Sequence, residues 1–256
     1  NMKKNIIALI AARMGSSRLP GKTLMPIVNV PMLGSLVERI RCCKSIDKIV
    51  LATTDNAEDN ELEKWCKENN IGCYRGSSDD VLLRLKLAAK KYRADYIVEL
   101  LGDNPLVHSD LIDSVIDRFL SNKYDYVATV TNEYPNADKS LKRFPIGVRV
   151  QMFSYDALEL CDNLAKKSYN REHATTFIGE NPSIFKTSFV EAKGQFFELN
   201  RPELNFAVNY DENMELIRFI FNRHIGKDRN FTIESAIQTY DDNDLLHNLM
   251  GCQEVF

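Results

Sequence analysis

The sequence predicts an α/β fold built on a mixed, mostly parallel sheet with a small insertion. Continuous apolar runs at residues 6–12, 49–53 and 96–101 are typical of strands that are buried on both faces. Segments with apolar residues at helical spacing follow these runs, which is the alternation of a parallel sheet. Glycines and charged residues come directly after the first and last of these runs, at the strand ends where α/β proteins bind their ligands.

The first run leads into a loop, residues 13–22, that carries three cations, two glycines and two serines. Arg13, Arg18 and Lys22 would face an anionic ligand at the end of the strand. The glycines let the backbone turn tightly, while the serine hydroxyls and successive N–H groups can form a nest for an anion. A basic surface loop without a ligand is the alternative interpretation.

The loop is not a Walker A motif. Gly15 and Gly21 are separated by one residue too many for that motif, and Pro20 removes an amide from the cradle. An anion site of another kind is therefore expected here.

Helix and strand signals alternate after the loop. Apolar residues on one face predict a helix from Pro31 to Cys43, before the strand at 49–53. Residues 54–56 can cap an acidic helix over 57–70, and Gly72 fits the stop of that helix.

Two further β–α units complete the first half of the chain. A short strand is expected at 73–75, and a helix with one apolar side begins near Val81. The strand at 96–101 ends in the polar turn 102–106, and a helix follows over 109–120.

The alternation changes in the second half. Strands are expected at 126–131 and 148–152, the latter from its period of two, with a polar loop between them. We then expect helices starting at Tyr155 and Lys167 and a strand at 185–190, which do not continue the regular alternation of strand and helix.

The last part of the chain is expected to return to the sheet. A strand at 206–208 would deliver residues 209–211 to the ligand edge, and helices near 212–223 and 232–239 close the chain. We interpret residues 132–190 as an insertion that extends the sheet and forms a dimer surface.

Length and composition fit one domain, residues 1–256, of a globular enzyme. The chain is 44% hydrophobic and 27% charged, and its net charge of −3 excludes a general attraction to nucleic acid or to an anionic membrane. Six cysteines show no metal-ligand spacing, and no signal peptide or membrane-spanning run is seen, so we expect a cytoplasmic protein with reduced thiols.

Ala11 to Lys22, read as Ala-Ala-Arg-Met-Gly-Ser-Ser-Arg-Leu-Pro-Gly-Lys, resembles the signature loop of the CMP-sugar synthetases. The resemblance is strongest to the spore-coat-polysaccharide type of cytidylyltransferase, a relative of the acylneuraminate and ketodeoxyoctonate cytidylyltransferases. It implies a Rossmann-like nucleotidyltransferase fold of the GT-A-like kind, in which this loop wraps the triphosphate of CTP. The implied nucleotide-binding residues are Ala11, Ala12, Arg13, Met14, Gly15, Ser16, Ser17, Arg18, Lys22, Arg75, Ser77, Asp80 and Asp103.

A magnesium site is expected at the same edge. Asp103 directly follows an apolar strand, and Gly102 to Leu106 matches the family motif Gly-Asp-X-Pro-Leu, in which the Asp is the metal ligand. Mg²⁺ is usually held by one or two carboxylates together with phosphates. Asn209 departs from the family, which has an Asp there, and Asp211 could supply the missing charge. In the alternative reading, Asp103 and Asp211 only cap a turn and a helix.

The acceptor would be bound by the insertion. Arg171-Glu172-His173 matches a signature of the spore-coat branch, and Arg149 and Gln151 lie on the preceding strand. Arg can clamp a carboxylate or phosphonate with two hydrogen bonds. His173 could equally be a hydrogen-bonded helix residue.

The resemblance implies Mg²⁺-dependent transfer of CMP from CTP to a small anionic acceptor, such as a nonulosonic or other sugar acid, with release of pyrophosphate. Arg13, Arg18, Lys22 and Asp103 would be the catalytic residues of a homodimer. A phosphonate or a phospho-alcohol is the alternative acceptor. A sugar-nucleotide-dependent glycosyltransferase, or a non-catalytic nucleotide-binding subunit, is the alternative function.

Overall fold

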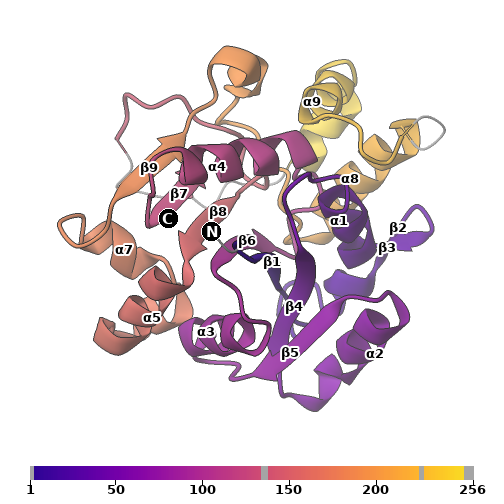
Figure 1. The fold of residues 1–256 in the computed structure, drawn as a ribbon. Helices are drawn as coiled ribbons and strands as arrows, with labels where there is room; N and C mark the ends of the chain where they lie inside the picture. The colour runs from indigo at the N-terminus through magenta and orange to yellow at the C-terminus, as the bar shows by residue number, and fades with distance from the viewer. Residues whose placement is uncertain (1–2, 134–137, 225–227, 251–256) are drawn as a thin grey trace.

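A seven-stranded sheet forms the centre of the described part of the chain (Figure 1). The computed structural model describes residues 3–133, 138–224 and 228–250. The strand order is β5-β4-β1-β6-β8-β7-β9. The bounds are β1 (Ile6–Ala11), β4 (Lys48–Thr54), β5 (Gly72–Gly76), β6 (Tyr96–Leu101), β7 (Tyr126–Thr129), β8 (Gln151–Ser154) and β9 (Thr187–Val190).

The predicted mixed, mostly parallel sheet is confirmed. β5, β4, β1 and β6 are parallel neighbours, so their carboxyl ends meet at one edge. Within the described residues β8 runs against both of its neighbours, β6 and β7, while β9 is parallel to β7. The β8, β7 and β9 strands thus extend the sheet beyond β6.

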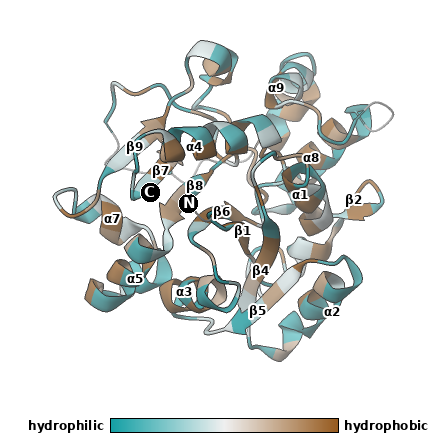
Figure 2. Cartoon of the chain, in the orientation of Figure 1, coloured by the Kyte–Doolittle hydropathy of each residue, from teal (hydrophilic) through white to brown (hydrophobic). Residues whose placement is uncertain are grey.

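Helices cover both faces of the sheet (Figure 1) and turn apolar residues toward it (Figure 2). One core contains residues of α1, α2, α4, α8 and α9, and the other contains residues of α3, α5 and α7. The bounds are α1 (Met32–Ile40), α2 (Asn60–Glu68), α3 (Val81–Lys91), α4 (Ser109–Ser121), α5 (Tyr155–Leu164), α6 (Ser168–Glu172), α7 (Thr176–Glu180), α8 (Asp211–His224) and α9 (Ile233–Asp241).

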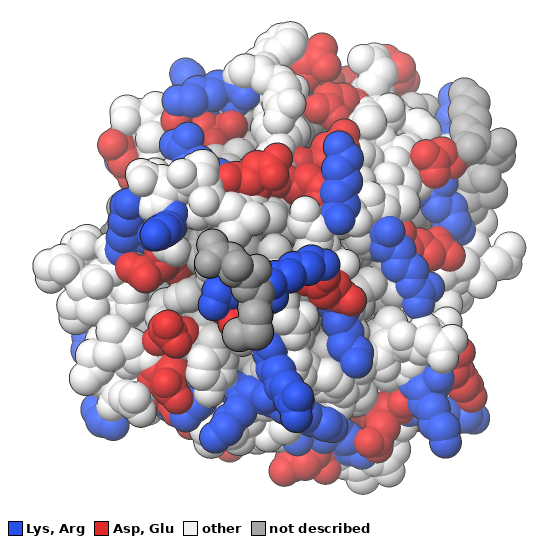
Figure 3. Space-filling view, in the orientation of Figure 1, with Lys and Arg blue, Asp and Glu red and all other residues white. Residues whose placement is uncertain are grey.

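Short elements connect this framework. They are the 3-10 turns η1 (Lys22–Leu24), η2 (Ala57–Asp59), η3 (Gly194–Leu199) and η4 (Asp244–Leu249), and the hairpin of β2 (Pro26–Ile27) and β3 (Val30–Pro31). Among the described residues, no helix is both long and apolar enough to cross a bilayer. On the face seen in Figure 3, basic and acidic side chains are interspersed.

The prediction of a strand at 206–208 is wrong, although the segment does reach the ligand edge. It is extended and hydrogen-bonds to two loops: the N–H of Phe206 donates to the carbonyl of Ile146 (2.8 Å), and that of Val208 donates to the carbonyl of Asp103 (2.9 Å). Gly147, with φ of 95°, permits this approach, since a Cβ there would lie 2.3 Å from the amide nitrogen of Ala207.

The predicted cap and stop of the acidic helix are also wrong. Asn56 makes no side-chain cap, and the chain forms the turn η2 before α2 begins at Asn60. The left-handed residue after α2 is Asn70, with φ of 56°, while Gly72 already lies in β5. The helical stretch expected from Lys167 is divided into α6 and α7.

Candidate nucleotide and acceptor site

The loop after β1 is organised around the backbone of Met14. Its carbonyl accepts hydrogen bonds from the N–H groups of Ser16 and Gly21, both at 2.9 Å, so it draws the two ends of the loop together. Gly21 has φ of 74°, a left-handed conformation that glycine adopts without steric cost. The hydroxyl of Ser16 accepts from the N–H of Leu19 (3.2 Å), whose side chain is buried. The serine therefore shapes the loop as well as offering a hydroxyl.

Three cations lie on this loop, as expected. Arg13 and Arg18 are exposed, and the Arg18 guanidinium carbon lies 5.2 Å from the centre of the Tyr210 ring. Lys22 is half-buried and donates to the carbonyl of Val208 (2.8 Å), with its Nζ 3.5 Å from Oδ2 of Asp103. The loop thus contacts both the end of β6 and the segment that precedes α8.

Asp103 lies at the carboxyl end of β6, beside the start of the loop. The N–H of Gly102 donates to the carbonyl of Ala11 (3.1 Å), and a Cβ on Gly102 would lie 2.6 Å from the Cβ of Ala12. Glycine is therefore required for the two strand ends to approach this closely. The Asp103 side chain is 28% exposed, so its carboxylate can reach a ligand.

The pairing of Val208 with Asp103 brings Asn209 next to Asp103 along the backbone. Asn213 fixes the turn that follows, because its Oδ1 accepts from the N–H groups of Asn209 (3.1 Å) and Tyr210 (3.0 Å). Asp211 is exposed at the first position of α8. Sequence reasoning missed Asn213, for which the sequence offers no signal beyond its place in a helix start.

Oxygen donors suited to Mg²⁺ are present at this edge in Asp103, Asn209 and Asp211. Among the residues that the structure describes, no group of three or more His, Cys, Asp or Glu side chains is placed to hold a metal ion. A hard cation here would need phosphate oxygens to complete its ligands, which is the usual arrangement for Mg²⁺.

Arg75, predicted to bind nucleotide, holds the turn after β4. Its guanidinium donates to the carbonyls of Thr54 (2.9 Å) and Asn56 (2.7 Å) and to Oδ1 of Asn60 (2.6 Å). That turn carries Asp59, a fully buried carboxylate whose Oδ1 accepts from the N–H of Met14 (2.7 Å). Asp59 was missed because it is one of several acids in a segment predicted only as an acidic helix.

Ser77 and Asp80 shape the start of α3. The Ser77 hydroxyl accepts from the N–H of Asp80 (3.0 Å), and Asp80 caps the helix by accepting from the N–H of Leu83 (3.0 Å). Arg171 donates to both carboxylate oxygens of Asp80, at 3.0 Å and 2.8 Å, and to Oδ1 of Asp162 (2.6 Å). In this structure Arg171 therefore ties α6 to α3 and α5.

The other residues predicted to bind the acceptor have different surroundings from Arg171. Gln151 donates from its Nε2 to Oε2 of Glu99 (3.3 Å), the acid whose pKa burial raises and the charge of Arg149 lowers. Gln151 is buried, where its Oε1 accepts from the hydroxyls of Tyr126 (2.5 Å) and Thr175 (2.7 Å). His173 is exposed, with its ring 4.7 Å from that of Tyr169. 

The comparisons with known proteins agree with this geometry. A family model described as cytidylyltransferase matches residues 7–219. The chain belongs to the cytidylyltransferase family. This cytidylyltransferase is 39% identical, over 73% of its length and 72% of the relative's, to an uncharacterised protein of Methanocaldococcus jannaschii. It is 30% identical, over 86% of its length and 87% of the relative's, to the spore coat polysaccharide biosynthesis protein SpsF of Bacillus subtilis.

A solved structure supports the same assignment over the whole chain. The cytidylyltransferase of Leptospira borgpetersenii superposes with a TM-score of 0.84 at 26% identity, covering 99% of this chain and 100% of that one. The family suggested by the Ala11–Lys22 loop is thus confirmed, as is the nucleotidyltransferase fold.

Two acids of this cytidylyltransferase, the buried Glu99 and the half-buried Glu133, went unnoticed in the sequence. Burial raises the pKa of Glu99, and the charges of Arg149 and Arg84 only partly offset this. Burial also raises the pKa of Glu133, against the charge of Arg149 and a hydrogen bond from Thr131. The charge of Arg149 therefore acts to lower the pKa of both acids. A charged residue inside the apolar run 96–101 was the available signal for Glu99.

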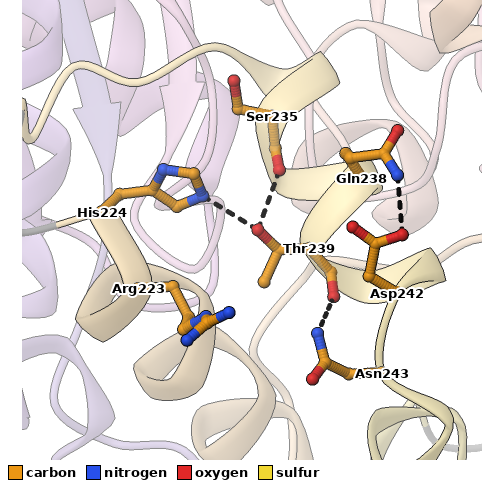
Figure 4. A pocket seen from close by; sticks show the side chains of 7 residues that line it. All are labelled: Arg223, His224, Ser235, Gln238, Thr239, Asp242 and Asn243. Carbon is orange, nitrogen blue, oxygen red and sulfur yellow. Dashed lines mark hydrogen bonds between the residues drawn. The ribbon is translucent and has the colours of Figure 1, made fainter.

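The cavity in Figure 4 belongs to a different part of the cytidylyltransferase. It measures about 210 Å³ and is lined by Arg223, His224, Ser235, Gln238, Thr239, Asp242 and Asn243. His224 hydrogen-bonds to the hydroxyl of Thr239 (2.9 Å) across it. The cavity lies at the C-terminal end of α8, whereas Asp211 begins that helix. A helix of 14 residues is about 20 Å long, so this cavity is separate from the ligand edge.

Proposed function

We propose that this cytidylyltransferase transfers CMP from CTP to the hydroxyl of a small sugar acid, a nonulosonic acid or a related compound, and releases pyrophosphate. The observation that supports the proposal is the position of Arg13, Arg18 and Lys22 on the loop after β1, with Lys22 beside Asp103 at the carboxyl end of β6. Three cations and one carboxylate at a strand edge suit a triphosphate with its metal. The relative named for polysaccharide biosynthesis supports a sugar acceptor.

The reaction would be a displacement at the α-phosphorus. A bond forms from the acceptor oxygen to this phosphorus as the bond from the phosphorus to the oxygen that bridges to the β-phosphate breaks, so pyrophosphate leaves and the proton of the acceptor hydroxyl passes to solvent. Arg13, Arg18 and Lys22 would bind the triphosphate and stabilise the charge that develops on pyrophosphate. Positioning and preorganised charge are the main contributions a protein makes to such transfers.

We propose that Asp103 holds Mg²⁺ in the nucleotide complex, with Asn209 and Asp211 as further oxygen donors. The bound ion would polarise the phosphoryl oxygens and neutralise part of their charge. Lys22 would bind the phosphates from its place beside Asp103.

The anionic group of the acceptor is proposed to lie near Arg149. Arg171 already hydrogen-bonds to Asp80 and Asp162, so its role would be to hold α6 against α3 and α5. His173, exposed at the end of α6, would face the acceptor from the rim.

We also propose a homodimer formed by the insertion, residues 132–190. Its exposed large apolar side chains support this, namely Leu164, Tyr169, Ile184 and Phe189. Analytical ultracentrifugation of the parent and of Phe189→Ser with Ile184→Ser tests it. A parent that sediments as a monomer would exclude the dimer.

The function is tested by pyrophosphate release from each of the four ribonucleoside triphosphates across a panel of sugar acids, phosphonates and phospho-alcohols. We expect release from CTP with a sugar acid and little from UTP, ATP or GTP. Consumption of a sugar nucleotide without use of free CTP would indicate a glycosyltransferase instead. CTP binding without turnover on any acceptor would contradict the proposed activity.

A further inference from the structure

One peptide group of the loop, between Arg13 and Met14, is held from both sides by buried side chains. Its carbonyl accepts from the hydroxyl of Thr23 (2.9 Å), and its N–H donates to Oδ1 of Asp59 (2.7 Å). Thr23 is 2% exposed and Asp59 is fully buried. A peptide held at both its donor and its acceptor cannot rotate, so the direction in which Arg13 leaves the backbone is set.

Asp59 is itself held firmly. Its Oδ2 accepts from the N–H of Thr54 (3.3 Å) and from the Thr54 hydroxyl. The Thr54 hydroxyl also accepts from the N–H of Asn56 (3.2 Å), and Arg75 holds the carbonyls of both these residues. The Asp59 carboxylate is thus hydrogen-bonded to the last residue of β4, the strand next to β1 in the sheet.

Asp59 is one of several charged residues that act on the buried Arg84. Burial and the charge of Arg13 lower the pKa of Arg84, while Asp59 and Glu99 raise it, so Asp59 acts electrostatically within the group that contains Arg84 and Arg13. Both oxygens of Asp59 accept hydrogen bonds, Oδ1 from Met14 and Oδ2 from Thr54, so the side chain is fixed in one orientation.

We propose that Asp59 and Thr23 are positioning residues of the cytidylyltransferase site, which preset Arg13 and the Met14 turn for the triphosphate without touching it. The proposal rests on the proposed function. Because these hydrogen bonds already fix the peptide group, the loop should lose less conformational entropy when the nucleotide binds. It also gives Arg75 a role: this arginine acts on the nucleotide loop through the turn that carries Asp59.

Matched variants separate this role from a general loss of stability. Thr23→Val removes the hydroxyl at nearly constant shape, and Thr23→Ser restores it. Asp59→Ala removes the carboxylate. Thr232→Val, which deletes the side-chain cap of α9, is a control that weakens the fold away from the loop. Calorimetry measures CTP affinity, and amide exchange by NMR measures the protection of the Met14 N–H without nucleotide.

We expect Thr23→Val and Asp59→Ala to weaken CTP binding about ten-fold, the size expected for losing a hydrogen bond to or beside a charged group. Thr23→Ser should restore the parental affinity, and Thr232→Val should leave it unchanged. Protection of the Met14 amide should be lost in Asp59→Ala. Unchanged affinity in Thr23→Val, or unchanged Met14 protection in Asp59→Ala, would overturn the proposal.

A double-mutant cycle tests whether Asp59 acts through Arg13. In an Arg13→Ala background, Asp59→Ala should weaken CTP binding by less than two-fold, because the side chain it positions is already gone. Full additivity would show that Asp59 does not work through Arg13. A parent that binds CTP but releases no pyrophosphate would refute the proposed activity alone, since affinity and exchange need no turnover.

Discussion

Lys22 and Asp103 face each other across the carboxyl edge of the sheet, with Nζ of the lysine 3.5 Å from Oδ2 of the aspartate. The same ammonium donates to the carbonyl of Val208 (2.8 Å), so one side chain connects the loop after β1, the end of β6 and the segment before α8. The ion pair is long and partly solvated, and pairs of that kind contribute little to stability. Its value would lie in placing a cation and a carboxylate side by side for a ligand that needs both.

We expect Lys22→Met to lower kcat/KM for CTP by about 10²–10³, the cost of removing one preorganised charge from a transition state. Lys67→Met, on the exposed side of α2, is the control, and its kcat/KM for CTP should equal that of the parent. Steady-state pyrophosphate release measures both. Equal activity of Lys22→Met and the parent would exclude the lysine from the site.

Turnover should depend on a divalent cation. EDTA is expected to abolish pyrophosphate release and Mg²⁺ to restore it. Asp103→Asn should be more damaging than Asp211→Asn, because Asp103 sits against the loop whereas Asp211 is exposed at the start of α8. Mg²⁺ titrations of the two variants measure this, and an Asp103→Asn enzyme with parental activity at saturating Mg²⁺ would remove Asp103 as a ligand.

Asn209→Asp introduces the negative charge that the resemblance to the cytidylyltransferases predicts at this position. Because the backbone N–H of residue 209 is held by Asn213, the substitution should change charge with little change of geometry. We expect a lower Mg²⁺ requirement and a higher KM for an anionic acceptor, since like charges repel strongly in a partly dry site. If neither constant changes, position 209 lies outside the metal's contacts.

Arg171→Met should destabilise the fold by about 1.5–3 kcal/mol, because it removes hydrogen bonds to two carboxylates that are mostly shielded from water. Urea unfolding at pH 7 measures this. Lys167→Met, from an exposed ion pair on the same segment, should change stability by less than about 0.5 kcal/mol. A parental stability with a raised acceptor KM would instead favour direct binding of the acceptor by Arg171.

The effect of Arg171 should depend on pH. Burial opposes ionisation of Asp162, but hydrogen bonds from Arg171 and Lys86 outweigh it and lower the pKa of Asp162. A carboxyl group with a lowered pKa stabilises the fold fully above its unfolded pKa of about 3.9, and this contribution is lost as the pH falls through the lowered value. The difference between parent and Arg171→Met should therefore be constant near neutrality and shrink below about pH 4.

Local sequence signals were sufficient for the first half of the fold. Apolar runs and helical spacing predicted β1, β4, β6 and their helices, because buried strands and amphipathic helices have characteristic periods. The segment 206–208 looked the same but is no strand, since its hydrogen bonds go to Ile146 and Asp103 in loops rather than to a neighbouring strand. Periodicity reports burial and not the identity of the hydrogen-bond partner.

By itself, the sequence determined the family and the position of the Ala11–Lys22 loop that we propose to bind the nucleotide. The order of Arg, Gly-Ser-Ser-Arg and Pro-Gly-Lys in residues 13–22 is a local pattern, which a linear chain displays in full. Only the tertiary structure decided what each polar side chain contacts. Arg75 holds a turn, Arg171 pairs with Asp80 and Asp162, and Asp59 reaches the amide of Met14 across 45 positions of sequence. Such assignments depend on which groups the sheet brings within about 3 Å of one another, the range of a hydrogen bond, and sequence spacing does not encode that distance.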